Sequence, residues 1–185
     1  MYNKEELIKY FNDWEQHLKK QKIPGWDDLP NLELYMDQVL FIVNQYNNIL
    51  NAKTENAPLT SPMINNYVKH KTIPAPVKKK YSRVHIAYLI MLCTLKQALS
   101  ISTIEKILPI GLEEEEVKKR YESFIKNQQK AIRYVSEQVT KVSNPILNEE
   151  DDPDRINDLV WQLAISANIF KTLTEQMTVL TDDKQ

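Results

Sequence analysis

The apolar residues of this chain recur every three or four positions over nearly its whole length, and this spacing limits the fold more than any other feature. It is typical of amphipathic α-helices, which have a period of 3.6 residues. Helices are predicted over residues 5–21, 32–50, 62–70, 83–99, 103–108, 113–142 and 153–180. No segment has a convincing strand pattern. We therefore expect an all-α protein with at most a small wing.

Prolines mark the main interruptions of this pattern. Pro74 and Pro76 remove backbone donors and favour extended neighbours, so residues 72–77 are predicted to form a loop or a small irregular hairpin. Thr60 and Ser61 precede Pro62, which is a typical helix start. Residues 143–152 are acidic and contain a proline, so a linker is expected there.

The composition excludes several classes of protein. Only two glycines occur, so neither G-x-G-x-x-G nor the G-x-x-x-x-G-K-[ST] phosphate loop can be written in the 185 residues. The single cysteine, Cys93, cannot form an internal disulfide or a multi-cysteine zinc cluster, which favours a reducing compartment. No apolar run approaches the ~20 residues of a membrane span. We expect a cytoplasmic protein with no membrane association, metal or cofactor.

Candidate catalytic groups are sparse. His85 and Cys93 lie on one predicted helix, eight residues and therefore roughly 12 Å apart, too far for a nucleophile and its base. Both are interpreted as packing groups. The acidic residues at 27–28 and 149–154 lack the spacing of an EF-hand. The sequence therefore predicts no enzyme and no catalytic residue.

The formal net charge of −1 hides an uneven distribution along the chain. Residues 1–52 carry five lysines and eight acidic residues (−3), and residues 97–185 carry eleven basic and sixteen acidic residues (−5). Residues 53–96 carry eight basic residues and one glutamate (+7). Such a segment is typical of a surface that binds a polyanion, because neutralised phosphates release their counterions. A solvated basic face without a partner is the alternative.

The order of predicted elements over residues 32–108 resembles the winged helix-turn-helix of MerR-type regulators. Their recognition-helix motif T-L-R-Y-Y-E-x-x-G-L-I-x-P falls on residues 63–74, with one position fewer before the final proline, and their wing motif R-x-Y falls on 79–81. The leucine-rich motif that follows is met by Leu89, Leu92, Leu95 and residues 99–104. Asn65 and Asn66 stand in place of that family's Arg and first Tyr, and Lys71 replaces its Gly.

Three further segments, residues 26–30, 34–39 and 59–69, are similar to a bacterial family known only as a domain of unknown function. This resemblance covers roughly residues 25–130. It implies no activity.

The MerR-like resemblance implies which residues contact double-stranded DNA. The asparagines would read adenine edges, the hydroxyl groups would contact phosphate, and the basic residues would clamp the backbone. Tyr67 is instead predicted to be a core residue. Ordinary exposed amides and a free basic turn are the alternatives. The predicted DNA-binding residues are Thr60, Ser61, Asn65, Asn66, Lys69, Lys71, Lys78, Lys79, Lys80 and Arg83.

We expect three regions: an N-terminal helix and loop (1–28), a winged helix-turn-helix (29–110) and a helical pair for dimerisation or sensing (111–185). The recognition helix lies near 62–70 and the basic wing near 74–83. Apolar positions within 113–142 are spaced four and three apart, typical of a homodimer seam, or of a helix that folds back on 154–180. A dimer would place two recognition helices ~34 Å apart.

The main alternative is a helical protein-interaction adaptor whose helix-turn-helix no longer binds DNA. The acidic flanks and the replaced Arg and Gly favour it. Trp14, Trp161, Phe170 and Met177 are interpreted as core residues rather than the lining of an effector pocket, and no effector is predicted.

Overall fold

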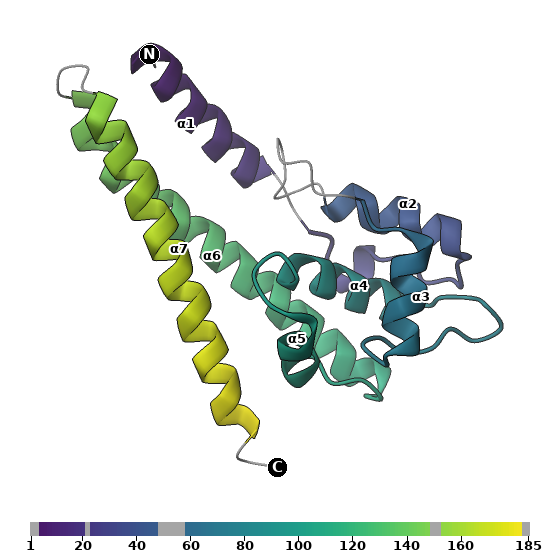
Figure 1. The fold of residues 1–185 in the computed structure, drawn as a ribbon. Helices are drawn as coiled ribbons and strands as arrows, with labels where there is room; N and C mark the ends of the chain where they lie inside the picture. The colour runs from purple at the N-terminus through teal and green to yellow at the C-terminus, as the bar shows by residue number, and fades with distance from the viewer. Residues whose placement is uncertain (1–3, 21–22, 48–57, 149–152, 183–185) are drawn as a thin grey trace.

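The computed structural model describes residues 4–20, 23–47, 58–148 and 153–182. Over these ranges the prediction of an all-α fold is confirmed, because the only β-structure is two isolated bridges, Leu34 with Tyr81 and Val77 with Lys80 (Figure 1). The elements are α1 (Lys4–Lys20), the 3-10 helix η1 (Trp26–Asp28), α2 (Met36–Asn47), α3 (Ser61–Lys69), α4 (Arg83–Leu95), α5 (Ile101–Ile107), α6 (Glu114–Asn148) and α7 (Pro153–Asp182).

Helix α4 lies at the centre of the fold and packs against α2 and α6. Its side chains from His85 to Cys93 are all buried, as expected for a helix that is apolar on nearly every side. The hydroxyl of Tyr88 donates to the carbonyl of Pro109 at 2.6 Å, so this buried polar group is satisfied. The prediction of a central core helix is confirmed.

The core extends beyond α4 in both directions along the sequence. Trp26 of η1 and Tyr121 of α6 meet edge to face with ring centroids 6.1 Å apart. The Tyr121 hydroxyl donates to the carbonyl of Pro24 at 3.0 Å, and burial raises the pKa of Tyr121 well above its ordinary value. One core therefore crosses both expected divisions, at 28/29 and at 110/111.

Helix α2 begins at Met36, so the predicted start near residue 32 is wrong. The backbone of Leu34 is already paired with Tyr81 through two N–H···O bonds of 2.8 Å. The amide of Tyr35 donates to the side chain of Gln38 at 2.9 Å, which caps the helix start. The predicted continuation beyond Asn47 lies outside the described residues.

Two other predicted boundaries also differ. Helix α4 ends at Leu95 and gives way to turns over 96–98. Helix α6 continues through Pro145 to Asn148, so the predicted start of the linker at residue 143 is wrong. The proline lacks one backbone donor but does not end the helix. The rest of the predicted linker, residues 149–152, lies outside the described residues.

Helices α6 and α7 form the C-terminal pair, and α7 runs along one edge of the molecule (Figure 1). It contacts α5 and α6, whereas α1 packs on α6. Trp161, Phe170 and Met177 of α7 are 64%, 56% and 59% exposed, so their interpretation as core residues is wrong. None of the helices in the described ranges is both long and apolar enough to span a membrane.

Candidate nucleic-acid interface

Helix α3 is held in place by one amide side chain and by its own apolar face. The side chain of Asn44 donates to the Leu59 carbonyl at 3.0 Å and accepts from the Leu59 amide at 2.8 Å. Ile64 and Tyr67 are buried against the core, which confirms the prediction for Tyr67. Asn65 and Asn66 are exposed. The predicted recognition helix therefore has one fixed inner face and one polar outer face.

The first turn of α3 has no side-chain cap. Thr60 occupies the N-cap position with extended backbone, its side chain makes no capping hydrogen bond, and it is exposed. Ser61 is half-buried. The free amides and the helix dipole make such an end suitable for an anion.

The last turn of α3 ends in a Schellman motif with lysine at its critical position. The amide of Thr72 donates to the Tyr67 carbonyl at 2.9 Å, and the amide of Lys71 donates to the Val68 carbonyl at 3.1 Å. Lys71 has a φ of 58°, a left-handed conformation usually taken by glycine. Lys69 and Lys71 are both exposed at this end.

The loop between α3 and α4 contains a tight two-residue hairpin, which confirms the predicted loop or small hairpin. The amide of Lys80 donates to the Val77 carbonyl at 2.9 Å, and the reverse bond is 3.2 Å. Lys78 and Lys79 form the turn with φ of 49° and 63°. Positive φ at both central residues is typical of a type I′ turn, which favours Asn-Gly.

Lys71, Lys78 and Lys79 are the only non-glycine residues with positive φ in the described parts of the chain. Left-handed backbone costs a non-glycine residue roughly 1–2 kcal/mol. All three are exposed, and all three belong to the predicted DNA-binding set. The chain thus places positive charge where glycine or asparagine would fit with less strain, and strain of this kind clusters at functional sites.

The hairpin is anchored to α4 by a buried histidine. His85 Nδ1 accepts the amide of Ser82 at 3.0 Å, so its proton lies on Nε2, which is 3.3 Å from the carbonyl of Ala75. Burial lowers the pKa of His85 below its ordinary value and keeps the ring neutral near pH 7. The bridge between Leu34 and Tyr81 fixes the other side of the loop.

Two predicted phosphate ligands have partners within the chain. Lys80 Nζ lies 3.2 Å from a carboxylate oxygen of Glu33 and 5.9 Å from the ring centre of Tyr35. The guanidinium of Arg83 lies 5.6 Å from the ring centre of Trp26, and its Nε is buried without a hydrogen bond. The residues of the set with exposed charge are therefore Lys69, Lys71, Lys78 and Lys79.

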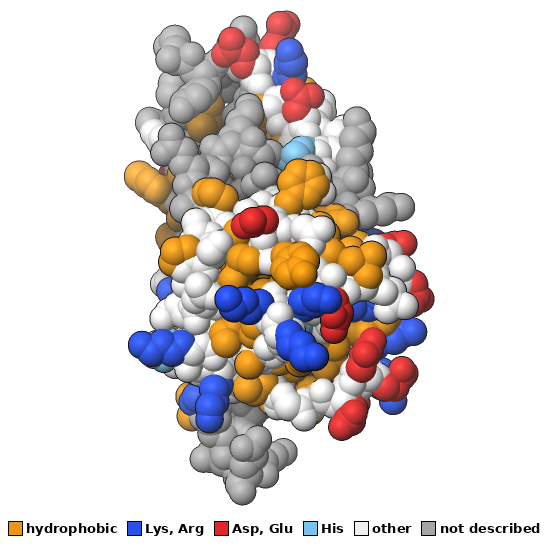
Figure 2. Space-filling view, turned by 90° about the vertical axis from the view of Figure 1, so that its right-hand side faces the viewer, with side chains coloured by type: hydrophobic (Ala, Val, Ile, Leu, Met, Phe, Trp, Pro, Cys, Tyr) orange, Lys and Arg blue, Asp and Glu red, His pale blue; other side chains and the backbone are white. Residues whose placement is uncertain are grey.

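The charge of this region is strongly one-sided. Residues 58–96 contain seven Lys and Arg and no Asp or Glu. Figure 2 shows Lys and Arg side chains gathered among exposed apolar side chains on one face, with acidic side chains toward one edge. The exposed apolar residues near Lys80 are Tyr35 and Val77.

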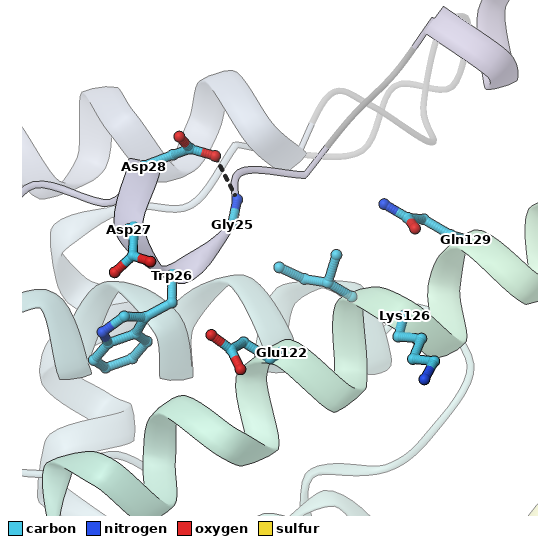
Figure 3. Close-up of a pocket in the computed structure, with 8 residues that line it drawn as sticks. Gly25, Trp26, Asp27, Asp28, Glu122, Lys126 and Gln129 are labelled. Carbon is cyan, nitrogen blue, oxygen red and sulfur yellow. Dashed lines mark hydrogen bonds between the residues drawn. The ribbon is translucent and has the colours of Figure 1, made fainter.

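A separate pocket lies between η1 and α6 (Figure 3). Its volume is ≈ 390 Å³. Asp28 turns back to accept the amide of Gly25 at 2.9 Å, and Lys118 outside the pocket pairs with Asp27 at 3.8 Å. No group of three possible metal ligands occurs among the described residues. The lining residues are Gly25, Trp26, Asp27, Asp28, Glu122, Ile125, Lys126 and Gln129.

Three residues that position the basic face were not predicted to do so from the sequence: Asn44, Glu33 and His85, which was expected only to pack. No local signal singles out Asn44, because the same predicted helix also carries side-chain amides at positions 38, 45, 47 and 48. No local pattern connects Glu33 to Lys80, because their contact depends on the bridge between Leu34 and Tyr81.

The fold and this face define a class of all-helical proteins with an anchored basic hairpin beside a short exposed helix. The model of the family described as "Domain of unknown function (DUF1836)" matches residues 24–124, more than half of the chain. The protein belongs to this family. The match includes the whole candidate interface and leaves α1 and α7 outside it. No curated protein and no solved structure matches the chain.

Proposed function

We propose that the protein is a DNA-binding transcriptional regulator that uses a MerR-like winged helix-turn-helix, with α3 as recognition helix and residues 74–83 as wing. The observation that carries this proposal is the set of three exposed lysines held in left-handed backbone, Lys71 after α3 and Lys78 and Lys79 at the hairpin tip. Because the backbone of these lysines is fixed, positive charge is held at two places: the C-terminal end of α3 and the tip of the hairpin.

The geometry of α3 supports a role in the major groove. Asn65 and Asn66 occupy its exposed side, where an amide can pair bidentately with adenine. The uncapped amides behind Thr60 suit a backbone phosphate. In this arrangement the exposed asparagines of α3 contact bases, and the phosphate contact at its first turn orients the helix on the duplex.

The wing supplies phosphate contacts through the lysines that form no ion pair with another residue of the described ranges. Lys80, held by Glu33, positions the hairpin rather than binding phosphate. Lys69, Lys71, Lys78 and Lys79 then make about four phosphate contacts, which predicts a slope of roughly −3 to −4 for log K against log salt.

The test is fluorescence anisotropy of a labelled random-sequence duplex titrated at several salt concentrations. The informative variant is Lys78→Asn/Lys79→Gly, because Asn-Gly is the preferred type I′ pair and preserves the turn while removing two charges. The matched control is Lys126→Gln/Lys130→Gln, which removes two exposed charges from α6.

Binding should weaken in the wing variant, and its salt slope should flatten by about 2. The α6 control should keep most of the wild-type affinity. Equal losses in both variants would indicate only a general charge effect and would contradict the wing assignment.

A helical protein-interaction adaptor is the second candidate. The observation that favours it is the exposure of Leu32, Tyr35, Phe41 and Val77, since large apolar side chains on a surface mark protein contacts. An adaptor would bind no duplex even at low salt, so the same titration decides between the two functions.

A further inference from the structure

The outer face of α3 presents two neighbouring amide side chains in a fixed orientation. Ile64 and Tyr67 are buried and define the inner face of the helix. Asn65 and Asn66 are exposed. Successive residues are about 100° apart around a helix, so the two amides lie on either side of the middle of the outer face. Both belong to the N-terminal half of α3, which is the part of a recognition helix that meets base edges.

The four bases differ in the side chains that read them in the major groove. Guanine is most often read by arginine, cytosine donates to a carboxylate, and adenine pairs with asparagine or glutamine through its N6 and N7 atoms. Helix α3 contains no arginine, aspartate or glutamate, and Lys69 in its last turn is its only charged residue. The amides in its N-terminal half therefore match adenine.

The one arginine of residues 58–96 is engaged within the chain. The guanidinium of Arg83 lies 5.6 Å from the ring centre of Trp26, and its Nε atom is buried. Carboxylates are also lacking, because residues 58–96 contain no Asp or Glu and the nearby Glu33 pairs with Lys80. The face around α3 thus offers neither a free arginine for guanine nor a free carboxylate for cytosine.

We propose that the protein discriminates A·T from G·C pairs through Asn65 and Asn66, so that its target is an A·T-rich duplex read in the major groove. This inference rests on the proposed function, because it requires α3 to enter that groove. In each contact the amide Nδ2 donates to adenine N7, and Oδ1 accepts from adenine N6. Lys78 and Lys79 contact phosphates of any sequence and set the affinity that is common to all duplexes.

The test compares three labelled duplexes of equal length by fluorescence anisotropy: one of mixed A·T pairs, one of mixed G·C pairs and one of inosine·cytosine pairs. Inosine lacks the N2 amino group of guanine, so inosine·cytosine resembles A·T in the minor groove and G·C in the major groove. The A·T duplex should bind at least about 10-fold more tightly than the other two, which should bind alike.

The informative variant is Asn65→Ala/Asn66→Ala. Both residues are exposed and alanine favours a helix, so the variant should retain the helical circular dichroism of the wild type. It should lose the preference for A·T and keep the wild-type affinity for the G·C duplex. The matched control is Asn127→Ala/Asn168→Ala, which removes two exposed amides from α6 and α7 and should keep the preference.

Two further measurements separate base contacts from phosphate contacts. Replacing each adenine by 7-deazaadenine removes the N7 acceptor but leaves base pairing and the minor groove unchanged, so binding of the wild type should weaken several-fold. Asn65→Ala/Asn66→Ala should bind the two kinds of A·T duplex alike. Lys78→Asn/Lys79→Gly should weaken binding to every duplex by the same factor and leave the A·T preference intact.

Equal, salt-sensitive binding of the three duplexes would overturn the A·T preference and leave the proposed function standing. An inosine·cytosine duplex that binds as tightly as A·T would place the preference in the minor groove and overturn the role of the asparagines. An A·T preference that persists in Asn65→Ala/Asn66→Ala would also overturn that role. No binding of any duplex at low salt would overturn both this inference and the proposed function.

Discussion

Helices α4 and α7 are both apolar on nearly every side, but the chain encloses one and exposes the other. Every residue of α4 from His85 to Cys93 is buried between α2, α6 and the loop before it. In α7 the apolar residues face away from a narrow contact with α5 and α6. Apolar composition therefore does not by itself predict that a helix is enclosed by its own chain.

The two regions also differ in how firmly their backbones are specified. The part of the chain that contains α4 has an amide clamp at Asn44, a histidine anchor at His85 and three left-handed lysines. Helix α7 has regular backbone and local hydrogen bonds such as Thr174 to the carbonyl of Phe170. The region with fixed loops carries the proposed DNA contacts, and the regular helix carries most of the exposed large apolar side chains of the described residues.

The largest expected effect is on the free energy of unfolding, when the same isoleucine-to-alanine substitution is made in α4 and in α7. Ile86→Ala in α4 should lower the free energy of unfolding by about 2–5 kcal/mol, because Ile86 is 0% exposed and its removal leaves a cavity. Ile165→Ala in α7 should change it by less than about 0.5 kcal/mol, since Ile165 is 60% exposed in the single chain. Urea unfolding of each variant beside the wild type measures both changes.

Similar losses at the two positions would contradict this comparison. They would mean that α7 is packed within its own chain as tightly as α4.

The fold was predictable where a local signal and the tertiary contacts agree. The short helix predicted over residues 103–108 is present as α5, which begins two residues earlier, at Ile101, where the Ser100 hydroxyl caps it by accepting the amide of Thr103 at 3.1 Å. The start of α2 was not predictable, because the 3.6-residue period continues back to Leu32 while a distant bridge to Tyr81 holds Leu34 extended. A periodic pattern indicates that a segment favours a helix, but it cannot show that a residue distant in the chain will hold part of that segment extended.

The candidate site was predictable to a similar extent. Residue type and order placed Lys71, Lys78 and Lys79 in one basic region, and the structure adds their left-handed backbone. The sequence could not show that Lys80 pairs with Glu33 or that Arg83 lies over Trp26, because both contacts join segments that are distant in the chain. A cation that pairs within the molecule is less available to phosphate, and no local sequence pattern indicates that pairing.

A smaller effect on the free energy of unfolding distinguishes Asn44, whose side chain bonds the backbone of Leu59, from an exposed asparagine on α7. Asn44→Ala should cost about 1–3 kcal/mol, because it leaves the amide and carbonyl of the buried Leu59 without their partner. Asn168→Ala on the exposed side of α7 should instead raise stability by roughly 0.5 kcal/mol, since alanine has the higher helix propensity.

The measurement is again the free energy of unfolding in urea. A neutral result for Asn44→Ala would show that water replaces both hydrogen bonds. The position of α3 would then rest on Ile64 and Tyr67 alone.

The smallest effect is a change in the free energy of unfolding that has opposite signs when lysine is replaced by glycine after α3 and within α7. Lys71→Gly should stabilise the chain by about 0.5–1 kcal/mol, because glycine adopts the φ of 58° found there without the strain that a lysine bears. Lys171→Gly should destabilise it by about 1 kcal/mol, since position 171 is inside a regular helix. Lys71→Gly should also weaken binding to random-sequence duplex, so that stability rises while affinity falls. If stability and affinity both fell, the left-handed conformation at Lys71 would not be a source of strain, and the argument that charge is kept there at the expense of stability would fail.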